Sequence, residues 1–234
     1  MARSGPKPSA AATSAKPRSR GRGANSEGTR ERLLAAALET LVEEGYASAS
    51  ARAIAGRAGC NQAVIYYHFG GVDELLASAV NRSGRQRLER YRVAMAELTD
   101  PAEIITTWRE LHREDIQVGH VPALVELLGG VASSEILREG LGEAVQPSMD
   151  FITETIGRVV EATGLSGVVP IEAAADAVFS LFIGVEMLTH VDGDTDRPDK
   201  LFAAGQQFAT QAAPLLTILG AVAADPERNR PGAR

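Results

Sequence analysis

The sequence predicts an all-α protein in which three short N-terminal helices are followed by six further helices. Three observations favour this fold class. Hydrophobic residues make up 44% of the 234 residues and aromatic residues only 5%, and an apolar content carried by Ala, Leu and Gly suits packed helices better than strands. Apolar residues recur at helical spacing along most of the chain. No stretch alternates apolar and polar residues as a half-buried strand would.

The two ends of the chain are predicted to be flexible. Residues 1–28 are rich in Ser, Ala, Gly, Pro and Arg and have no apolar period, so they cannot offset the entropy of ordering. We expect a disordered basic tail there and a second flexible tail over residues 226–234. The first tail holds six basic residues and one acid, a charge of +5, which leaves −11 for the rest of the chain. Because the charge is so segregated, the net charge of −6 does not exclude binding to nucleic acid.

Residues 29–80 are predicted to form a three-helix domain. The first helix begins at Thr29 and ends at Gly45, and its apolar residues lie on one face: Leu34, Leu38, Leu41 and Val42. Two short helices follow, over residues 51–58 and from about residue 62 to Phe69. The residues that cap or end them are Ser50, Gly59 and Asn61. Two short helices joined by a turn of three to four residues that contains Gly form a helix-turn-helix.

Residues 81–225 are predicted to form a second, six-helix domain, whose first helix begins within the first domain. Its helices are separated by breakers at Asp100-Pro101, His120-Val121-Pro122, Gly164 to Pro170 and Asp192 to Pro198. The expected spans are 73–98, 101–118, 122–132, 134–163, 171–190 and 198–220. Boundaries read from such patterns are uncertain by a few residues at each end.

A series of residues in the first domain falls in register with a known family: Gly45-Tyr46, Ile54-Ala55, Ala58-Gly59, Ile65-Tyr66, Phe69 and Glu74-Leu75-Leu76. On these residues the segment Thr29–Val80 resembles, without a gap, the DNA-binding domain of the TetR family of transcriptional regulators. The resemblance implies a homodimer that binds palindromic double-stranded operator DNA and represses transcription until a small-molecule effector releases it. Independently of the resemblance, a single cysteine, which cannot form an intramolecular disulfide, and the lack of an apolar secretory stretch at the start of the sequence predict a cytoplasmic location.

The third helix is the predicted reader of DNA sequence. Ile65 and Phe69 lie four residues apart and should pack inward, which leaves the other side chains toward the DNA. Gln62 can pair with adenine, and Ala63 or Val64 can touch a thymine methyl group. The full set of predicted DNA contacts is Ser50, Arg52, Gln62, Ala63, Val64, Tyr66, Tyr67 and His68.

One departure from the family pattern concerns the head of the helix that follows. The family commonly has a phosphate-binding lysine there, and this chain has Val72. Arg18, Arg20 and Arg22 in the basic tail are a candidate replacement as an arm that reaches DNA. A tail that never orders is the alternative.

An effector site is predicted in the second domain, where aromatic and polar residues share helical faces: Trp108, His112, Phe151, Thr155, Phe179, Phe182 and Glu186. Glu186 is the only Asp, Glu, Lys or Arg residue between residues 177 and 191. We expect it to be paired across a dimer, solvated, or directed into a ligand cavity. For the aromatic residues ordinary core packing remains open. The last two helices carry small residues that allow close helix contact, and the resemblance implies that they meet a second subunit: Ala173, Ala177, Gly184, Ala203, Ala204, Gly205, Ala209 and Ala212. Packing within one subunit is the alternative.

Other functions find less support in the sequence. No nucleophile motif or phosphate loop occurs, so we predict no catalytic residues and no cofactor. The four histidines are scattered and the single cysteine, Cys60, takes a packing position, so we predict no metal site. The apolar window at residues 171–191 holds three acids, and we therefore expect no membrane association. Two alternatives stay open: a helical protein that sequesters a ligand and has a degenerate DNA head, and a transcriptional activator or adaptor.

Overall fold

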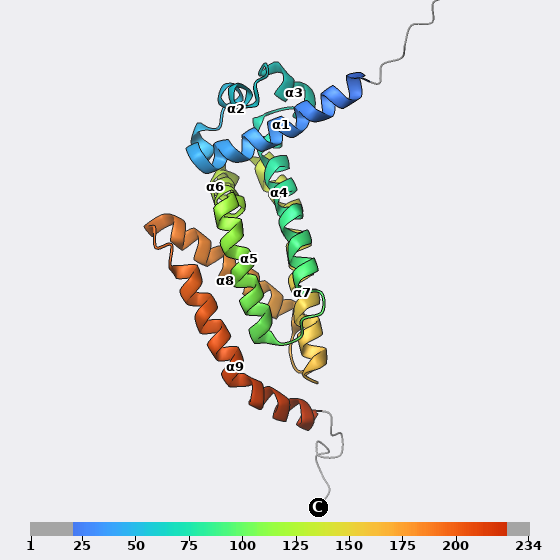
Figure 1. Ribbon diagram of the computed structural model, residues 1–234. Helices are drawn as coiled ribbons and strands as arrows, with labels where there is room; N and C mark the ends of the chain where they lie inside the picture. Colours follow the sequence, from blue (N-terminus) through green and yellow to red (C-terminus); the bar gives the residue numbers. More distant parts are fainter. Residues whose placement is uncertain (1–20, 224–234) are drawn as a thin grey trace, which may run out of the picture.

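The computed structural model describes residues 21–223, which are helical almost throughout and contain no strand (Figure 1). The first three helices, α1, α2 and α3, span Gly21–Glu44, Ala51–Ala58 and Ala63–Phe69. The other helices, α4 to α9, span Val72–Met95, Pro101–Val118, His120–Gly130, Glu135–Ala162, Ile171–Asp192 and Arg197–Ala223. Helix α1 lies across one end of α4 and α6. At that end of the molecule α2 packs on α1, and α3 packs on α4 and α2. Helix α9 lies at the opposite end.

Helix α1 begins at Gly21, eight residues before the start predicted at Thr29. The prediction of disorder is therefore wrong for residues 21–28. A helix that is already formed extends at low cost, because each added residue contributes a hydrogen bond without a new nucleus, and no proline interrupts residues 21–44. Residues 26–28 are exposed, so no apolar period signalled this turn. Residues 1–20 and 226–234 of the predicted tails lie outside the described residues.

The remaining helix boundaries agree with the predicted ones to within three residues. Local hydrogen bonds explain the agreement in the helix-turn-helix. The Ser50 hydroxyl accepts from the backbone N–H of Ala53 at 3.2 Å, and the Asn61 side chain accepts from that of Ala63 at 2.9 Å. Gly59 ends α2 with φ +64°, a left-handed conformation that favours glycine.

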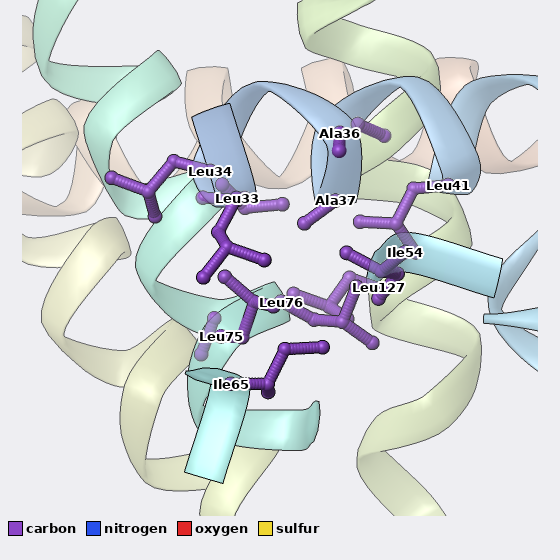
Figure 2. Packing of buried hydrophobic residues seen from close by; sticks show 14 of the residues in the cluster. Leu33, Leu34, Ala36, Ala37, Leu41, Ile54, Ile65, Leu75, Leu76 and Leu127 are labelled. Carbon is purple, nitrogen blue, oxygen red and sulfur yellow. The ribbon is translucent and has the colours of Figure 1, made fainter. Parts of the chain in front are cut away.

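A first hydrophobic core joins α1, α2 and α3 to α4 and α6. Figure 2 shows side chains from these five helices pointing toward one another: Leu33, Leu41, Ile54, Ile65, Leu75, Leu76 and Leu127. All seven are fully buried, and burial of each such side chain stabilises the fold by about 1.5–3 kcal/mol. Ile65 is the buried residue of α3, so this helix is anchored by its inner face and leaves its outer face on the surface.

Close contacts fasten this first core to the rest of the molecule. Gly140 of α7 packs so tightly on α4 that a Cβ atom there would lie 2.7 Å from the Cβ of Ala77. The Glu126 carboxylate on α6 accepts from the backbone N–H of Tyr46 at 3.0 Å and lies 3.3 Å from the ring of His190 on α8. Helix α6 therefore joins the helix-turn-helix to a helix of the second domain.

A second core lies farther along α4 and surrounds a buried charge. Asp115 of α5 is completely buried, accepts from the Tyr91 hydroxyl at 2.9 Å, and pairs with Arg90 and Arg87 of α4. Burial raises the pKa of the Tyr91 hydroxyl well above its usual value. Partial burial lowers the pKa of His120, whose ring contacts the Ser83 hydroxyl near this cluster. These polar contacts hold α4 against α5 and α6.

Among the described residues no single helix is long and apolar enough to span a membrane. Helices α5 and α6 meet the length and composition test together, but they are bent by 70° at the break between them. In the same part of the chain, no group of three or more His, Cys, Asp or Glu side chains is placed to hold a metal ion.

Candidate DNA-binding surface and effector cavity

Helix α3 carries most of the predicted DNA contacts on its outer face. Tyr66 and Tyr67 are 54% and 82% exposed, although large aromatic side chains are usually buried at least in part. Gln62 and Ala63 are also exposed, and Gln62 makes no capping hydrogen bond. The helix therefore presents an uncommitted amide beside two phenol groups, a set able to contact base edges and phosphates.

Two of the predicted residues on α3 are placed less favourably. Val64 is partly buried and packs on the first core. His68 is also partly buried, and its ring lies between those of Tyr67 and Phe69, with centroids 5.0 and 6.3 Å away. Both side chains are therefore committed in part to the protein itself.

Helix α2 contributes one free cation to the same surface. Arg52 is exposed and has no ion-pair partner among residues 21–223. Arg57, in contrast, pairs with Glu43 at 2.7 Å and Glu44 at 2.9 Å, and its hydrogen bonds to these acids raise its pKa. Ser50 is exposed, but its oxygen already caps α2. Arg52 is thus the better placed of the two predicted contacts on α2 to meet a phosphate.

The basic arm cannot be placed on this surface. Arg18 and Arg20 lie outside the described residues, and Arg22 falls in the first turn of α1. Val72, which stands where the family commonly has lysine, begins α4 and packs partly on the first core.

Two cavities in the second domain meet at Trp108. The first, of about 210 Å³, lies between α5, α8 and α9, and the second, of about 250 Å³, between α4, α5, α7 and α8. Ile105, Trp108 and Val178 line both. Of the predicted effector residues, Phe182 and Glu186 line the first cavity, and Phe151 and Thr155 line the second.

The other two predicted residues lie outside both cavities. Phe179 borders smaller spaces of about 20 and 40 Å³ next to Arg87. His112 is 2% exposed and lies behind the first cavity, with its Nε2 atom 3.1 Å from Oε1 of Glu186. The two groups are not oriented for a hydrogen bond. Neither ring nitrogen of His112 nor Oε1 of Glu186 has a hydrogen-bond partner among the described residues.

Several lining residues were missed by the sequence analysis. Phe202 of α9 lines the first cavity, and its ring centroid lies 5.9 Å from that of Trp108 and 5.4 Å from that of His112. The small residues of α9 predict contact with a second subunit and give no sign of an inner face. Gly205 and Ala209, predicted to face a second subunit, in fact face inward: Gly205 lines the first cavity and Ala209 is buried. The helical spacing of Phe202, Gly205 and Ala209 was a usable signal.

Comparisons with known proteins agree with this geometry. Residues 33–79 match the family model described as bacterial regulatory proteins, tetR family. An uncharacterized HTH-type transcriptional regulator of Mycobacterium bovis is 33% identical over 116 residues, which cover 49% of this chain and 59% of the relative. The match thus spans less than two thirds of that relative's length.

Solved structures extend the likeness to the fold of the second domain. A TetR transcription regulator from Haloarcula marismortui superposes with a TM-score of 0.64 at 18% identity, over 81% of this chain and 98% of that one. The regulator FadR from Bacillus subtilis, solved in complex with stearoyl-CoA, gives a TM-score of 0.64 at 17% identity, over 76% and 96%. Residues 33–79 thus carry the helix-turn-helix domain of the TetR family of bacterial regulatory proteins, and the described chain has the all-helical fold of solved TetR regulators.

Proposed function

We propose that this protein is a repressor that binds a palindromic operator as a homodimer and leaves it when a small molecule enters the cavities beside Trp108. The observation that carries the DNA-binding part is the outer face of α3, where Gln62, Tyr66 and Tyr67 are exposed while Ile65 fixes the helix to the core. Such a helix fits a major groove, and Arg52 at the head of α2 fits the adjacent phosphates. In this proposal the protein acts in the cytoplasm.

A second copy of the chain is the proposed occupant of the outer face of α8 and α9. Large apolar side chains on these helices are about half exposed or more: Leu188, Val191, Phe208, Leu215, Ile218 and Leu219. Large exposed apolar patches usually mark interaction sites. Pairing by a two-fold axis would set two α3 helices about 34 Å apart, the spacing of successive major grooves.

The effector part of the proposal rests on the two cavities and on their walls. Both are lined mainly by apolar side chains, which favours a small organic molecule. Helix α8 lines both cavities and carries His190, whose ring lies 3.3 Å from the Glu126 carboxylate. The same carboxylate accepts a hydrogen bond from the backbone N–H of Tyr46. Movement of α8 on ligand entry has a direct path to the helix-turn-helix. FadR, bound to stearoyl-CoA, is a precedent for a small-molecule complex in this fold.

Selection of operators from a random DNA pool with the purified protein tests the proposal. The expected outcome is enrichment of a palindrome, with an affinity that falls steeply with salt concentration and depends on sequence. Failure to enrich any sequence would support the alternative of a ligand-sequestering protein. With an operator in hand, transcription from a template that carries it separates repression, in which added protein lowers transcript yield, from activation.

A further inference from the structure

We propose that the effector is a small apolar molecule that carries one positive charge, and that Glu186 with the aromatic rings of the first cavity is its receptor. This inference rests on the proposed function, because it names the class of effector that the site beside Trp108 takes. The Glu186 carboxylate is buried, and burial of a carboxylate costs free energy.

Glu186 is the one charged residue in the wall of the first cavity, whose other described lining residues are uncharged. Of the described residues that line the first cavity, it alone has an ionisable side chain. It is 4% exposed, and its Oε1 atom has no hydrogen-bond partner. Its Oε1 atom instead lies 3.1 Å from the ring of His112. A buried carboxylate without a hydrogen bond costs several kcal/mol or more, so the free protein holds a costly group in the wall of the space that a ligand would fill.

Nearby basic side chains are engaged elsewhere. Arg109 and Arg113 of α5 both bind Asp199, at 2.9 and 2.6 Å, and these hydrogen bonds lower the pKa of Asp199 to about 2. Arg87 lies over the ring of Phe182 but faces the buried Asp115, 3.7 Å away. His112 is the nearest basic group to Glu186, and its orientation leaves the pair without a hydrogen bond. A cation supplied by the ligand would complete the site.

Aromatic rings from α5, α8 and α9 line the same cavity as Glu186. The ring centroid of Trp108 lies 6.0 Å from that of Phe182 and 5.9 Å from that of Phe202. The ring of His112 lies 5.7 Å from Phe182 and 5.4 Å from Phe202. The faces of aromatic rings attract organic cations, by up to about 2 kcal/mol or more where water is excluded. A carboxylate among several rings therefore selects a cation over a neutral molecule of the same shape and disfavours an anion.

The volume of the cavities limits the size of the molecule. The first cavity, of about 210 Å³, has room for one compact cationic group with its nearest carbon atoms. The second cavity continues on the other side of Ile105, Trp108 and Val178 with apolar walls, and is open to the apolar remainder of a longer ligand.

A pair of probes with the same shape and different charge tests this inference. Phenyltrimethylammonium is a cation, and tert-butylbenzene replaces its nitrogen by carbon. Binding is followed by the fluorescence of Trp108, the single tryptophan of the chain. We expect the parent protein to bind the cation more tightly than the neutral probe by at least about tenfold. Glu186→Gln should abolish this preference without weakening the neutral probe, and Glu186→Asp, which keeps the charge, should retain it.

The matched control is Glu172→Gln, which removes an exposed carboxylate from the same helix and should leave both affinities unchanged. Thermal unfolding of each variant confirms that it is folded. Equal affinity of the parent for the two probes, undetectable binding of the cation, or unchanged cation binding by folded Glu186→Gln would overturn the inference.

Operator release separates this inference from the proposed function. If the neutral probe displaces the selected operator as well as the cation does, effector control stands and the charge selectivity fails. If the cation binds through Glu186 and the operator is not displaced, the cation site stands and its link to DNA fails.

Discussion

Asp115 combines complete burial with polar contacts to three side chains. Its carboxylate is completely buried and meets two arginines and a phenol from α4. Asp199 offers a natural comparison, because it also meets two arginines but is 37% exposed. The two sites differ mainly in how much water competes for the same groups.

Asp115→Asn should lower the free energy of unfolding by about 2–4 kcal/mol, because it leaves Arg87 and Arg90 without their buried counter-charge. Asp199→Asn should cost less than about 1 kcal/mol, because water and salt screen an exposed pair. Urea unfolding of both variants measures the difference. Equal losses would show that burial of Asp115 does not strengthen its ion pairs.

Gln62 and Tyr66 are expected to play different parts in DNA binding. Gln62→Ala should relax the preference at one base pair of each half-site, with a loss of about 1–3 kcal/mol on the preferred base. Tyr66→Phe should weaken binding to all sequences alike, because a phosphate contact carries no sequence information. Affinities for a set of single-base operator variants distinguish the two. A uniform loss for Gln62→Ala would remove it from base reading.

At the scale of elements, a tight contact between α4 and α7 joins the two parts of the fold. Two glycines of α7 show that the close approach is confined to one position of the helix. A Cβ atom on Gly140 would meet Ala77 at 2.7 Å, whereas one on Gly142 would meet nothing within 4 Å. A glycine inside a helix often marks a close packing contact or a bend, and of these two only Gly140 lies at a close contact.

Gly140→Ala should therefore destabilise the protein by about 1–3 kcal/mol through overpacking. Gly142→Ala should stabilise it by up to about 1 kcal/mol, because alanine is the better helix former and the site is exposed. Thermal or urea unfolding of the two variants should therefore show changes in the free energy of unfolding of opposite sign. Stabilisation by both substitutions would show that α7 can move away from α4 at little cost.

The elements could be predicted from sequence where local chemistry sets their ends. Ser50, Asn61 and Gly59 bound the helix-turn-helix by contacts within a few residues, and α5 has the predicted span of residues 101–118. The start of α1 could not be predicted, because residues 21–28 have no apolar period. Helical spacing shows that a residue faces inward, but not which neighbouring helix it meets.

The same limit applies to the candidate effector site. Trp108, Phe182 and Glu186 were found because they stand out by residue type on predicted helices, and they line one cavity. Phe179 stands out in the same way but lies outside both cavities beside Trp108. Phe202 was missed because contact between α5 and α9 joins residues about 90 positions apart, which no local pattern reports.

At the scale of the whole molecule, the proposed dimer face is the surface most open to a direct test. Phe208 of α9 is 72% exposed, and a glutamate in its place would put a charge into the proposed interface. Phe208→Glu should therefore shift the protein from dimer to monomer in light scattering and weaken operator binding. Val93→Glu is the control, since Val93 is also 72% exposed but lies on α4. Equal behaviour of the two variants would place the interface elsewhere.

Helix α4 has a mechanical consequence that follows from its unbroken length. Its 24 residues make a rod about 36 Å long, which starts directly after α3 and ends with Met95 in the wall of the second cavity. A swing of about 5° displaces one end of such a rod by about 3 Å relative to the other. Hydrogen bonds to base edges tolerate a change in donor–acceptor distance of only a few tenths of an ångström. In a two-fold dimer the displacement of each α3 helix would count twice in the distance between the two α3 helices. A repacking in the cavity far too small to alter the fold would therefore exceed the tolerance of the DNA contacts.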